Sequence, residues 1–373
     1  MTSKLFSPLK IGPIELPNRI AVAPMCQYSA HDGVPDPDWH TQNLMNLAMT
    51  GAGLVMIEAT AVERLGRITH GCTGLWSDDT QAGMARMVAS ARRVASPGTR
   101  IGIQLGHAGR KASAQRPWEG GRALSAAEDP WGTISASAVP FEASWHTPKA
   151  MDDADIERVQ TAFANSARRA VAIGLDAIEM HAAHGYLLHQ FTSPLSNQRT
   201  DRYGGSLENR LRMPLEIARR MREAVPKSVV LGARITGTDW VANGVTPEEA
   251  VQFARGLKDA GFDYVCVSSG GVALGISIPV AANYQVHLAE KIKREVGIVT
   301  RAVGMIVQPA QAEEILAAGQ ADQVAMARAF LDNPRWVWHA AQQFGADFSY
   351  PPQYDRVRAK GWPGAALLRT VAQ

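Results

Sequence analysis

Short β-rich runs alternate with longer helical patterns along the chain, and this alternation limits the possible fold more than any other feature. Aliphatic and β-branched residues dominate each run, whereas the segments between the runs space their apolar residues as a helix does. Repeated strand and helix units favour parallel strands joined by right-handed crossovers. The runs lie at residues 19–24, 54–59, 100–106, 176–181, 229–235, 263–269, 297–304 and 323–328.

The segment at residues 151–174 illustrates the helical patterns. It begins with Asp residues suited to N-capping, and Ile156, Val159 and Phe163 recur at helical spacing. Eight such strand and helix units over 373 residues predict an α/β protein with a (β/α)8 TIM barrel. An open doubly wound sheet is the alternative, but it normally carries a GxGxxG turn after its first strand, and here the first run ends in Pro-Met-Cys at residues 24–26.

The composition is that of an ordinary globular protein, with 46% hydrophobic and 20% charged residues. No stretch approaches the roughly 18 to 20 unbroken apolar residues of a membrane span, and the N-terminus has no apolar export segment. Three cysteines far apart in the chain exclude a disulfide scaffold and a four-cysteine zinc site, and fit a reducing compartment. We therefore expect a cytoplasmic protein without a membrane partner.

The charge distribution argues against nucleic acid as a partner. The net charge of +3 comes from 38 basic and 35 acidic residues. No block of like charges and no basic patch interleaved with aromatic residues interrupts the chain.

Strand parity places polar side chains inside the predicted barrel. Alternate residues of a barrel strand face the interior, and the outward set should be apolar. In the third, fourth and fifth strands this rule leaves Gln104, His181 and Arg234 facing inward near the carboxyl ends, where barrel enzymes place their active sites. Because a buried polar group without a partner costs about 1–3 kcal/mol, a polar, planar ligand would satisfy all three.

Each of these residues also has a purely structural interpretation. Gln104 could be a satisfied interior amide, and Arg234 could pair with Glu179 on the neighbouring strand. His181 and His184 could be metal ligands of a barrel hydrolase, but such a site needs further His or Asp ligands at other strand ends, and the first strand offers none. Cys26 could be a small buried hydrophobe.

The last two strands end in residues suited to phosphate. Barrel enzymes often bind phosphate after these strands, through backbone amides, glycines and a basic residue. The chain supplies Val303 and Gly304 after the seventh strand, and Ala327 and Arg328 after the eighth. A phosphorylated planar cofactor would span this end and the Gln, His and Arg end.

Several motifs together resemble the old yellow enzyme family of FMN-dependent ene-reductases. They are PMCQY at residues 24–28, HAGRKA at 107–112, the run from HAAHGYL to ENR at 181–210, and the VSSGG and AVGMI runs. The similarity extends from about residue 5 to about residue 345. Cys26 and His184 place the chain nearer the thermophilic-like bacterial branch, which includes xenobiotic reductases and NADPH dehydrogenases.

The resemblance implies bound FMN. It places Gln104 at the pyrimidine edge of the flavin, Arg234 near N1 and O2, and the phosphate on Gly304 and Arg328. The full set of implied contacts is Ala23, Pro24, Met25, Cys26, Ala59, Gln104, Arg234, Val303, Gly304, Ala327 and Arg328.

The resemblance also implies the reaction. NADPH or NADH would reduce the flavin, and flavin N5 would pass hydride to an activated C=C bond of an α,β-unsaturated carbonyl or nitro compound. His181 and His184 would donate hydrogen bonds to the substrate oxygen, and Tyr186 would supply the proton. Tyr28 would add a hydrogen bond to the substrate, and Cys26 would tune the flavin. Both half-reactions would share one site, which implies ping-pong kinetics. A non-catalytic flavin-binding protein remains an alternative.

The expected organisation is one barrel domain at residues 1–345 and a C-terminal tail at 346–373. A long excursion at 106–150 follows the third strand, and we expect it to border the pocket because long ordered loops are usually functional. Residues 352–356 resemble the tail by which members of this branch send an arginine into a neighbouring active site. The resemblance thus implies that Arg356 contacts substrate across a homodimer or homotetramer interface.

Overall fold

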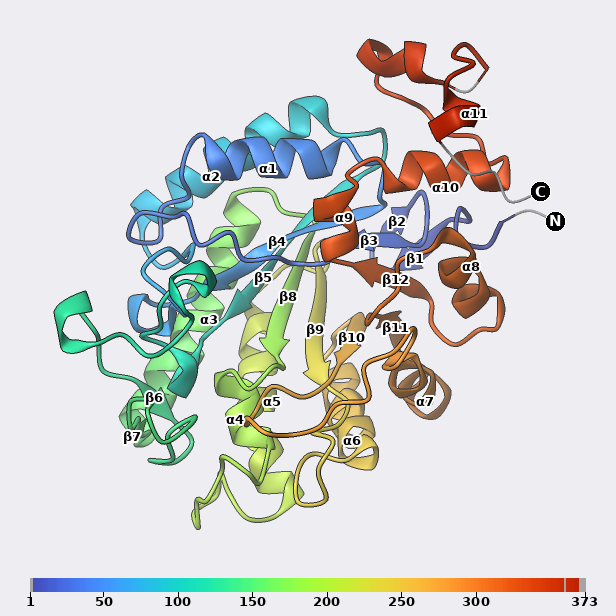
Figure 1. Ribbon diagram of the computed structural model, residues 1–373. Helices are drawn as coiled ribbons and strands as arrows, with labels where there is room; N and C mark the ends of the chain where they lie inside the picture. Colours follow the sequence, from blue (N-terminus) through green and yellow to red (C-terminus); the bar gives the residue numbers. More distant parts are fainter. Residues whose placement is uncertain (1–2, 359, 369–373) are drawn as a thin grey trace.

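A closed barrel of parallel strands with helices around it forms the centre of the protein (Figure 1). The computed structural model describes residues 3–358 and 360–368. Each strand pairs in parallel with its neighbour, and the last strand closes on the first through the pair Val324 and Ile20. The predicted TIM barrel is therefore confirmed. Its strands are β3 (Ile20–Val22), β4 (Leu54–Ala61), β5 (Arg100–Gly106), β8 (Ala177–Ala182), β9 (Val230–Thr236), β10 (Tyr264–Ser268), β11 (Val299–Ala302) and β12 (Gln323–Met326).

Helices cover the outside of the barrel. The helix predicted from residues 151–174 is α3 (Asp153–Ala172), and the side chain of Asp152 caps it by accepting a hydrogen bond from the Asp155 N–H at 2.9 Å. The others are α1 (Trp39–Ala48), α2 (Asp78–Val94), α4 (Leu187–Thr192), α5 (Leu207–Ala224), α6 (Pro247–Asp259), α7 (Val286–Val296), α8 (Pro309–Ala317), α9 (Arg328–Asp332), α10 (Trp336–Phe344) and α11 (Ala365–Leu368). No helix in the described ranges is long and apolar enough to cross a membrane.

An antiparallel hairpin at the N-terminus, which the sequence analysis did not predict, precedes the barrel. It consists of β1 (Leu9–Ile11) and β2 (Ile14–Leu16), joined by a turn in which Gly12 has a φ of 51°. The apolar side chains of the hairpin pack in one cluster with interior side chains of the barrel such as Leu54 and Val230. The hairpin thereby contributes apolar side chains to the barrel interior.

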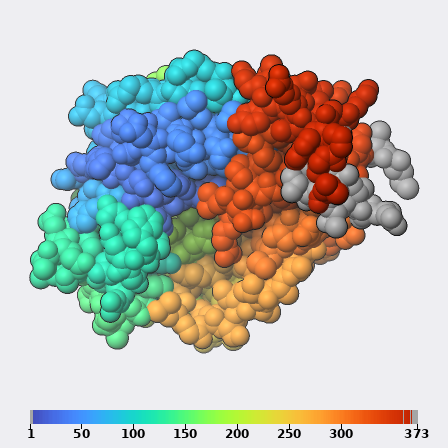
Figure 2. Space-filling view, turned by 45° about the horizontal axis from the view of Figure 1, so that its top comes forward, coloured from blue at the N-terminus to red at the C-terminus, as the bar shows by residue number. Residues whose placement is uncertain are grey.

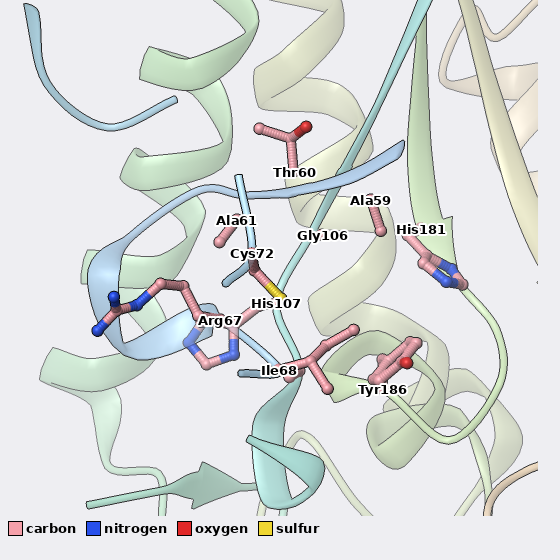
Figure 3. A pocket seen from close by; sticks show the side chains of 12 residues that line it. Ala59, Thr60, Ala61, Arg67, Ile68, Cys72, Gly106, His107, His181 and Tyr186 are labelled. Atoms are coloured by element: carbon pink, nitrogen blue, oxygen red, sulfur yellow. The ribbon is translucent and has the colours of Figure 1, made fainter. Parts of the chain in front are cut away.

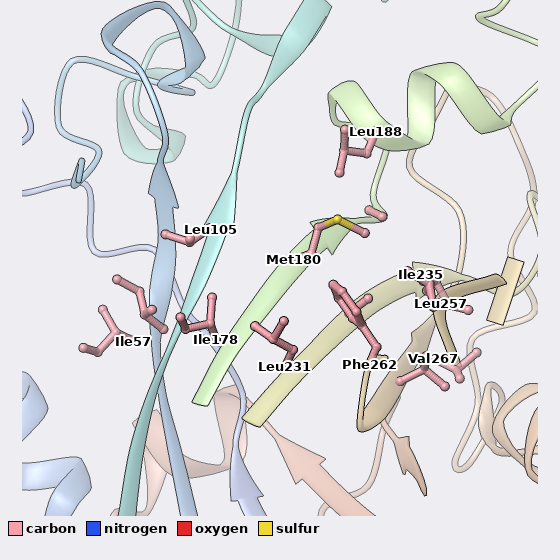
Figure 4. Packing of buried hydrophobic residues seen from close by; sticks show 14 of the residues in the cluster. Ile57, Leu105, Ile178, Met180, Leu188, Leu231, Ile235, Leu257, Phe262 and Val267 are labelled. Atoms are coloured by element: carbon pink, nitrogen blue, oxygen red, sulfur yellow. The ribbon is translucent and has the colours of Figure 1, made fainter. Parts of the chain in front are cut away.

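The outward-facing residues of the strands form the main hydrophobic core. Ile178 and Met180 of β8 and Leu231 and Ile235 of β9 are fully buried against the surrounding helices (Figure 4). These are the positions that strand parity assigns to the outer face. The alternate residues of the same strands, including Glu179 and His181, therefore project into the barrel.

A buried polar network crosses the barrel interior around Glu179, which has no exposed surface. Its carboxylate accepts hydrogen bonds from Gln104 Nε2 at 2.7 Å, from the Tyr264 hydroxyl at 2.9 Å and from Arg301 Nη1 at 2.9 Å. Gly232 makes room for this network, because a Cβ added there would lie 2.1 Å from the ring of Tyr264.

The partner of Glu179 differs from the structural interpretation that paired it with Arg234. Arg301 on β11 makes the ion pair instead, so that interpretation is wrong. In the strand register Arg234 stands opposite His181, and Glu179 stands opposite Gly232. Arg234 thus lies two residues beyond Gly232, nearer the carboxyl end of β9, and not opposite Glu179.

The segment between β5 and α3 holds three short 3-10 helices and two short strands. They are η2 (Gly109–Lys111), η3 (Pro117–Glu119), η4 (Ala126–Glu128), β6 (Ile134–Ser135) and β7 (Lys149–Ala150). This segment reaches the loop after the first barrel strand, because Arg116 Nε donates a hydrogen bond to the Tyr28 carbonyl at 2.9 Å and Trp118 packs edge-on against the Tyr28 ring.

The tail carries η5 (Pro352–Val357) and α11, drawn in red in Figure 1. The Arg356 side chain is exposed. Arg358 nearby contacts Asp355 at 2.6 Å and lies over the Tyr350 ring. Within the predicted tail at 346–373, residues 359 and 369–373 lie outside the described residues.

Removing Arg301 should destabilise the barrel. In Arg301→Met the carboxylate of Glu179 is left buried without its cation, and we expect the free energy of unfolding to fall by about 3–5 kcal/mol. The shift of the urea unfolding midpoint measures this loss. The double variant Glu179→Gln/Arg301→Met removes both charges of the pair and should lose less. Equal losses in the two variants would contradict the assigned role of the ion pair.

Candidate active site

A cavity open to solvent lies at the carboxyl ends of the barrel strands. Its volume is about 1210 Å³, including the space open to solvent. In Figure 2 the surface is hollowed between the blue N-terminal segments and the orange segments near the C-terminus. The residues around the cavity that the sequence analysis named are Ala23, His184, Arg234, Val303, Gly304, Ala327 and Arg328.

Two features of the cavity wall favour the binding of a ligand. Arg234 Nε is buried and has no hydrogen-bond partner among the described residues. Gly304 has a φ of 110°, and a Cβ there would lie 2.4 Å from Gln285 Nε2, so the wall keeps its backbone exposed at this position. A buried donor without a partner costs free energy unless a ligand satisfies it.

His181, His184 and Tyr186 stand together at the end of β8. The centroid of the His181 ring lies 5.1 Å from the centroid of the His184 ring and 5.1 Å from that of the Tyr186 ring. His184 Nδ1 is 3.4 Å from His181 Nε2, and His184 Nε2 is 2.7 Å from Ser268 Oγ. The other nitrogen of His181, Nδ1, is buried without a partner in the described part of the chain.

Burial, reinforced by the charge of Arg234, lowers the pKa of both His181 and His184 well below its ordinary value. Both imidazoles are therefore neutral at pH 7, and each carries one N–H donor. Because a neutral histidine needs no counter-ion, its N–H can donate a hydrogen bond to a substrate oxygen.

The two tyrosines of the site keep their protons. Burial is the main cause that raises the pKa of Tyr186 and of Tyr28 above the ordinary range. Each phenol is thus protonated at neutral pH. Tyr28 adopts a φ of 52°, a left-handed conformation that few non-glycine residues take.

Cys26 lies half-buried between β3 and Tyr28. Burial, followed by the nearby carboxylate of Glu58, raises the pKa of its thiol well above the ordinary value. A thiol held protonated is a poor nucleophile. Pro24 and Met25, the preceding residues, are also half-buried.

A second, smaller cavity of about 260 Å³ adjoins His181 and Tyr186. Figure 3 shows these two side chains on one side, with Cys72, Ile68 and His107 around the rest. Ala59 also lines this small cavity rather than the large one.

Gln104 occupies a different place from the other predicted cofactor contacts. It is 2% exposed, and its amide nitrogen already donates to Glu179. It lies in the polar network beneath the cavity, and its contact with a cofactor stays a prediction.

Sequence reasoning missed three polar residues of the site. Ser268 Oγ contacts His184, and Gln285 Oε1 accepts from Ser269 Oγ at 2.5 Å. Lys111 Nζ donates to the His184 carbonyl at 2.9 Å and lies 5.1 Å from the centre of the Tyr186 ring. Lys111 sits inside the HAGRKA motif, which was the available signal, whereas the position of Gln285 on a loop follows from the fold alone.

The described residues offer no set of ligands for a metal ion at the site. His181 and His184 are adjacent, but no group of three His, Cys, Asp or Glu side chains within the described residues could hold a metal ion.

The strand ends of this (β/α)8 barrel bring together two neutral histidines and a protonated tyrosine, with His184 and Arg234 lining the large cavity and His181 and Tyr186 the small one. This arrangement defines a TIM-barrel enzyme. A profile of the NADH:flavin oxidoreductase / NADH oxidase family matches residues 4–346. The chain is 42% identical over 364 residues to an NADPH dehydrogenase of Geobacillus sp. (strain WCH70), covering 97% of this chain and 99% of the relative.

Solved structures agree with this match. A morphinone reductase in complex with tetrahydroNAD has a TM-score of 0.74 and 26% identity, covering 94% of this chain and 93% of its own. A 2-naphthoyl-CoA reductase with 2-naphthoyl-CoA has a TM-score of 0.80 and 25% identity over 92% of this chain, which spans only 52% of that protein. The chain belongs to the NADH:flavin oxidoreductase / NADH oxidase family and is an FMN-dependent NAD(P)H oxidoreductase of the old yellow enzyme type.

The cavity fits FMN. The unpartnered Arg234 Nε suits an electron-rich edge of the planar ring, and the bare backbone at Gly304 with the cation of Arg328 suits a phosphate. Ala23 at the end of β3 leaves room for the ring between these groups.

Lys111 should give stability an unusual pH dependence. Burial, then the charge of Arg110, lowers its pKa from 10.5 to about 8. Between these values the unfolded chain holds the proton and the folded chain does not, so the free energy of unfolding should rise with pH, by at most about 3 kcal/mol. Below about pH 8 this contribution is constant. Urea unfolding of the protein and of Lys111→Met across this window measures the difference, and parallel pH curves would contradict the lowered pKa.

Proposed function

We propose that the enzyme reduces activated C=C bonds of α,β-unsaturated carbonyl or nitro compounds with NADPH or NADH. The names of its relatives support a nicotinamide donor and a reductase activity. When bound, FMN supplies the hydride transfer, from NAD(P)H to the β carbon of the alkene. We further propose a cytoplasmic location, where NAD(P)H is available.

The observation that carries this proposal is the neutral histidine pair beside a protonated tyrosine. Hydride addition at the β carbon builds negative charge on the carbonyl or nitro oxygen. Buried N–H donors aimed at such an oxygen stabilise the transition state, and losing one donor of this kind costs about 3–4 kcal/mol. His181 Nδ1, which has no partner among the described residues, matches this requirement, and His184 would add a second donor by exchanging its 3.4 Å contact with His181 Nε2 for the substrate oxygen.

Tyr186 is the proposed acid. Its phenol is kept protonated by burial, and its ring lies 5.1 Å from that of His181. It can therefore deliver a proton to the α carbon of a substrate whose oxygen is held by the histidines. Tyr28, with its own raised pKa, would donate a further hydrogen bond to the substrate.

Other residues would hold FMN and tune it. Arg234 would place a positive charge at the edge of the ring where negative charge grows on reduction, and Gly304 and Arg328 would bind the phosphate. Cys26, a protonated thiol, would tune the reactivity of FMN rather than act as a nucleophile. Since nicotinamide and alkene would use the same face in turn, we propose a ping-pong mechanism.

The proposed acid can be tested with Tyr186→Phe. We expect oxidation of the reduced enzyme by cyclohexenone to slow by about 10²- to 10⁴-fold, because the proton donor is lost. Reduction by NADPH, which needs no acid, should change little. Anaerobic stopped-flow absorption measures both steps separately, and an unchanged rate with cyclohexenone would remove Tyr186 from the mechanism.

The alternative of a non-catalytic flavin-binding protein gives a distinct result. It predicts yellow protein that does not oxidise NADPH in the presence of cyclohexenone. A ping-pong enzyme gives parallel lines in double-reciprocal plots at several fixed concentrations of the second substrate, and intersecting lines would contradict the shared site.

We also propose that the enzyme is a homodimer or homotetramer in which Arg356 reaches the active site of a neighbouring subunit. The exposed side chain of Arg356 supports this. Arg356→Ala should raise the KM for cyclohexenone by about 10-fold, as expected for a lost charged hydrogen bond. Arg358→Ala is the matched control, because Arg358 already contacts Asp355 and Tyr350 of its own chain. Unchanged kinetics for Arg356→Ala would refute the intersubunit role.

A further inference from the structure

We propose that His189, oriented by Asp239, is a positioning residue that holds the turn His184-Gly185-Tyr186 in its active geometry. This proposal rests on the proposed function, because that function explains why the geometry of the turn matters. The contacts that hold the turn are independent of that function. Neither His189 nor Asp239 lines the cavity, and both are completely buried behind it.

The turn has a conformation that the chain does not adopt without support. His184 has a φ of 59° and Gly185 a φ of 73°, and a non-glycine residue in this region is strained. The turn is also pressed against the loop after β10, because a Cβ added at Gly185 would lie 2.0 Å from the Gly271 carbonyl oxygen. Small rotations of the Gly185 peptide would move His184 and Tyr186 relative to each other.

His189 holds the N–H side of this turn. The Gly185 N–H donates to His189 Nδ1 at 2.8 Å, and the Thr236 hydroxyl lies 3.3 Å from the same nitrogen. Because Nδ1 accepts from the Gly185 N–H, it carries no proton, and the N–H of the ring is at Nε2. Only this tautomer allows the bond to Gly185.

Asp239 selects that tautomer. Its Oδ1 lies 3.1 Å from His189 Nε2, a bent contact that is chiefly electrostatic. Its Oδ2 accepts hydrogen bonds from the Ser193 hydroxyl at 2.7 Å and the Val245 N–H at 2.8 Å. Burial would raise the pKa of Asp239, but His189 and these hydrogen bonds outweigh it and hold the pKa below its ordinary value.

The carbonyl side of the turn is held independently. Lys111 Nζ donates to the His184 carbonyl at 2.9 Å and to the Gly271 carbonyl at 3.1 Å, and Gln190 Nε2 donates to the Gly185 carbonyl at 2.7 Å. His189 is the acceptor on the other side. Removing it leaves a buried N–H without a partner in the peptide that joins the two functional side chains.

Two variants of His189 separate positioning from simple stability. His189→Leu keeps the bulk and removes the acceptor, whereas His189→Asn places an amide oxygen near the position of Nδ1. We expect His189→Leu to slow oxidation by cyclohexenone about 100-fold, the size of effect that a misplacement near 1 Å produces, with reduction by NADPH changed less than about 3-fold. His189→Asn should recover most of the loss.

Two further measurements do not depend on turnover. Deuterium exchange in a peptide spanning residues 183–188 should be faster in His189→Leu than in His189→Asn. The ¹⁵N spectrum of His189 in the unmodified protein should show Nδ1 without a proton. As a stability control, Ile217→Ala creates a cavity under α5, where Ile217 is fully buried, and should lower the unfolding temperature without changing the ratio of the two half-reaction rates.

Several results would overturn the inference. They are an unchanged rate with cyclohexenone in His189→Leu, equal losses in the Leu and Asn variants, or a protonated Nδ1. If cyclohexenone does not oxidise the NADPH-reduced unmodified protein, the proposed function fails. The deuterium exchange and ¹⁵N results still decide whether His189 holds the turn.

Discussion

The ion pair between Glu179 and Arg301 is the interaction on which the interior of the barrel depends. Glu179 is fully buried, and its two oxygens receive donors from three other strands: Gln104, Tyr264 and Arg301. A buried carboxylate is tolerated only when its acceptors are filled in this way. Because these donors occupy both oxygens of Glu179, its carboxylate does not also pair with the polar side chains that lie closer to the carboxyl ends of the strands. Arg234 Nε and His181 Nδ1 consequently remain without partners and point to a ligand.

A second set of polar contacts explains how the barrel holds the turn that carries His184 and Tyr186. The strand β8 ends at Ala182, directly after His181, and the chain then makes a left-handed turn that brings His184 and Tyr186 beside His181. Lys111, Gln190 and His189 fix the peptide groups of this turn from three directions. The site thus consists of side chains aimed at a ligand and a second set of polar side chains that hold the backbone of the turn. Such preorganisation is what stabilisation of developing charge requires.

Much of this could be predicted from the sequence, for a physical reason. The alternation of strands and helices is a local periodic signal, so the barrel, its strands and the inward positions of His181 and Arg234 followed from it. Arg301 was missed although parity along residues 299–303 also turns it inward, and the pairing of Glu179 failed because it depends on strand register and on the space left by Gly232. The N-terminal hairpin was missed although LKIGPIEL at residues 9–16 alternates apolar and polar residues around a Gly-Pro turn. The contacts of His189 and Gln285 are tertiary, and no local pattern predicts them.

The central claim is that the cavity at the strand ends binds FMN and passes reducing equivalents from a nicotinamide to an activated alkene. The most direct test is the visible absorption spectrum of the purified protein, recorded anaerobically before and after NADPH and again after cyclohexenone. The account predicts flavin bands that bleach with NADPH and return with the enone. Colourless protein that cannot be reconstituted with FMN, or flavin bands that stay bleached after the enone, would contradict it.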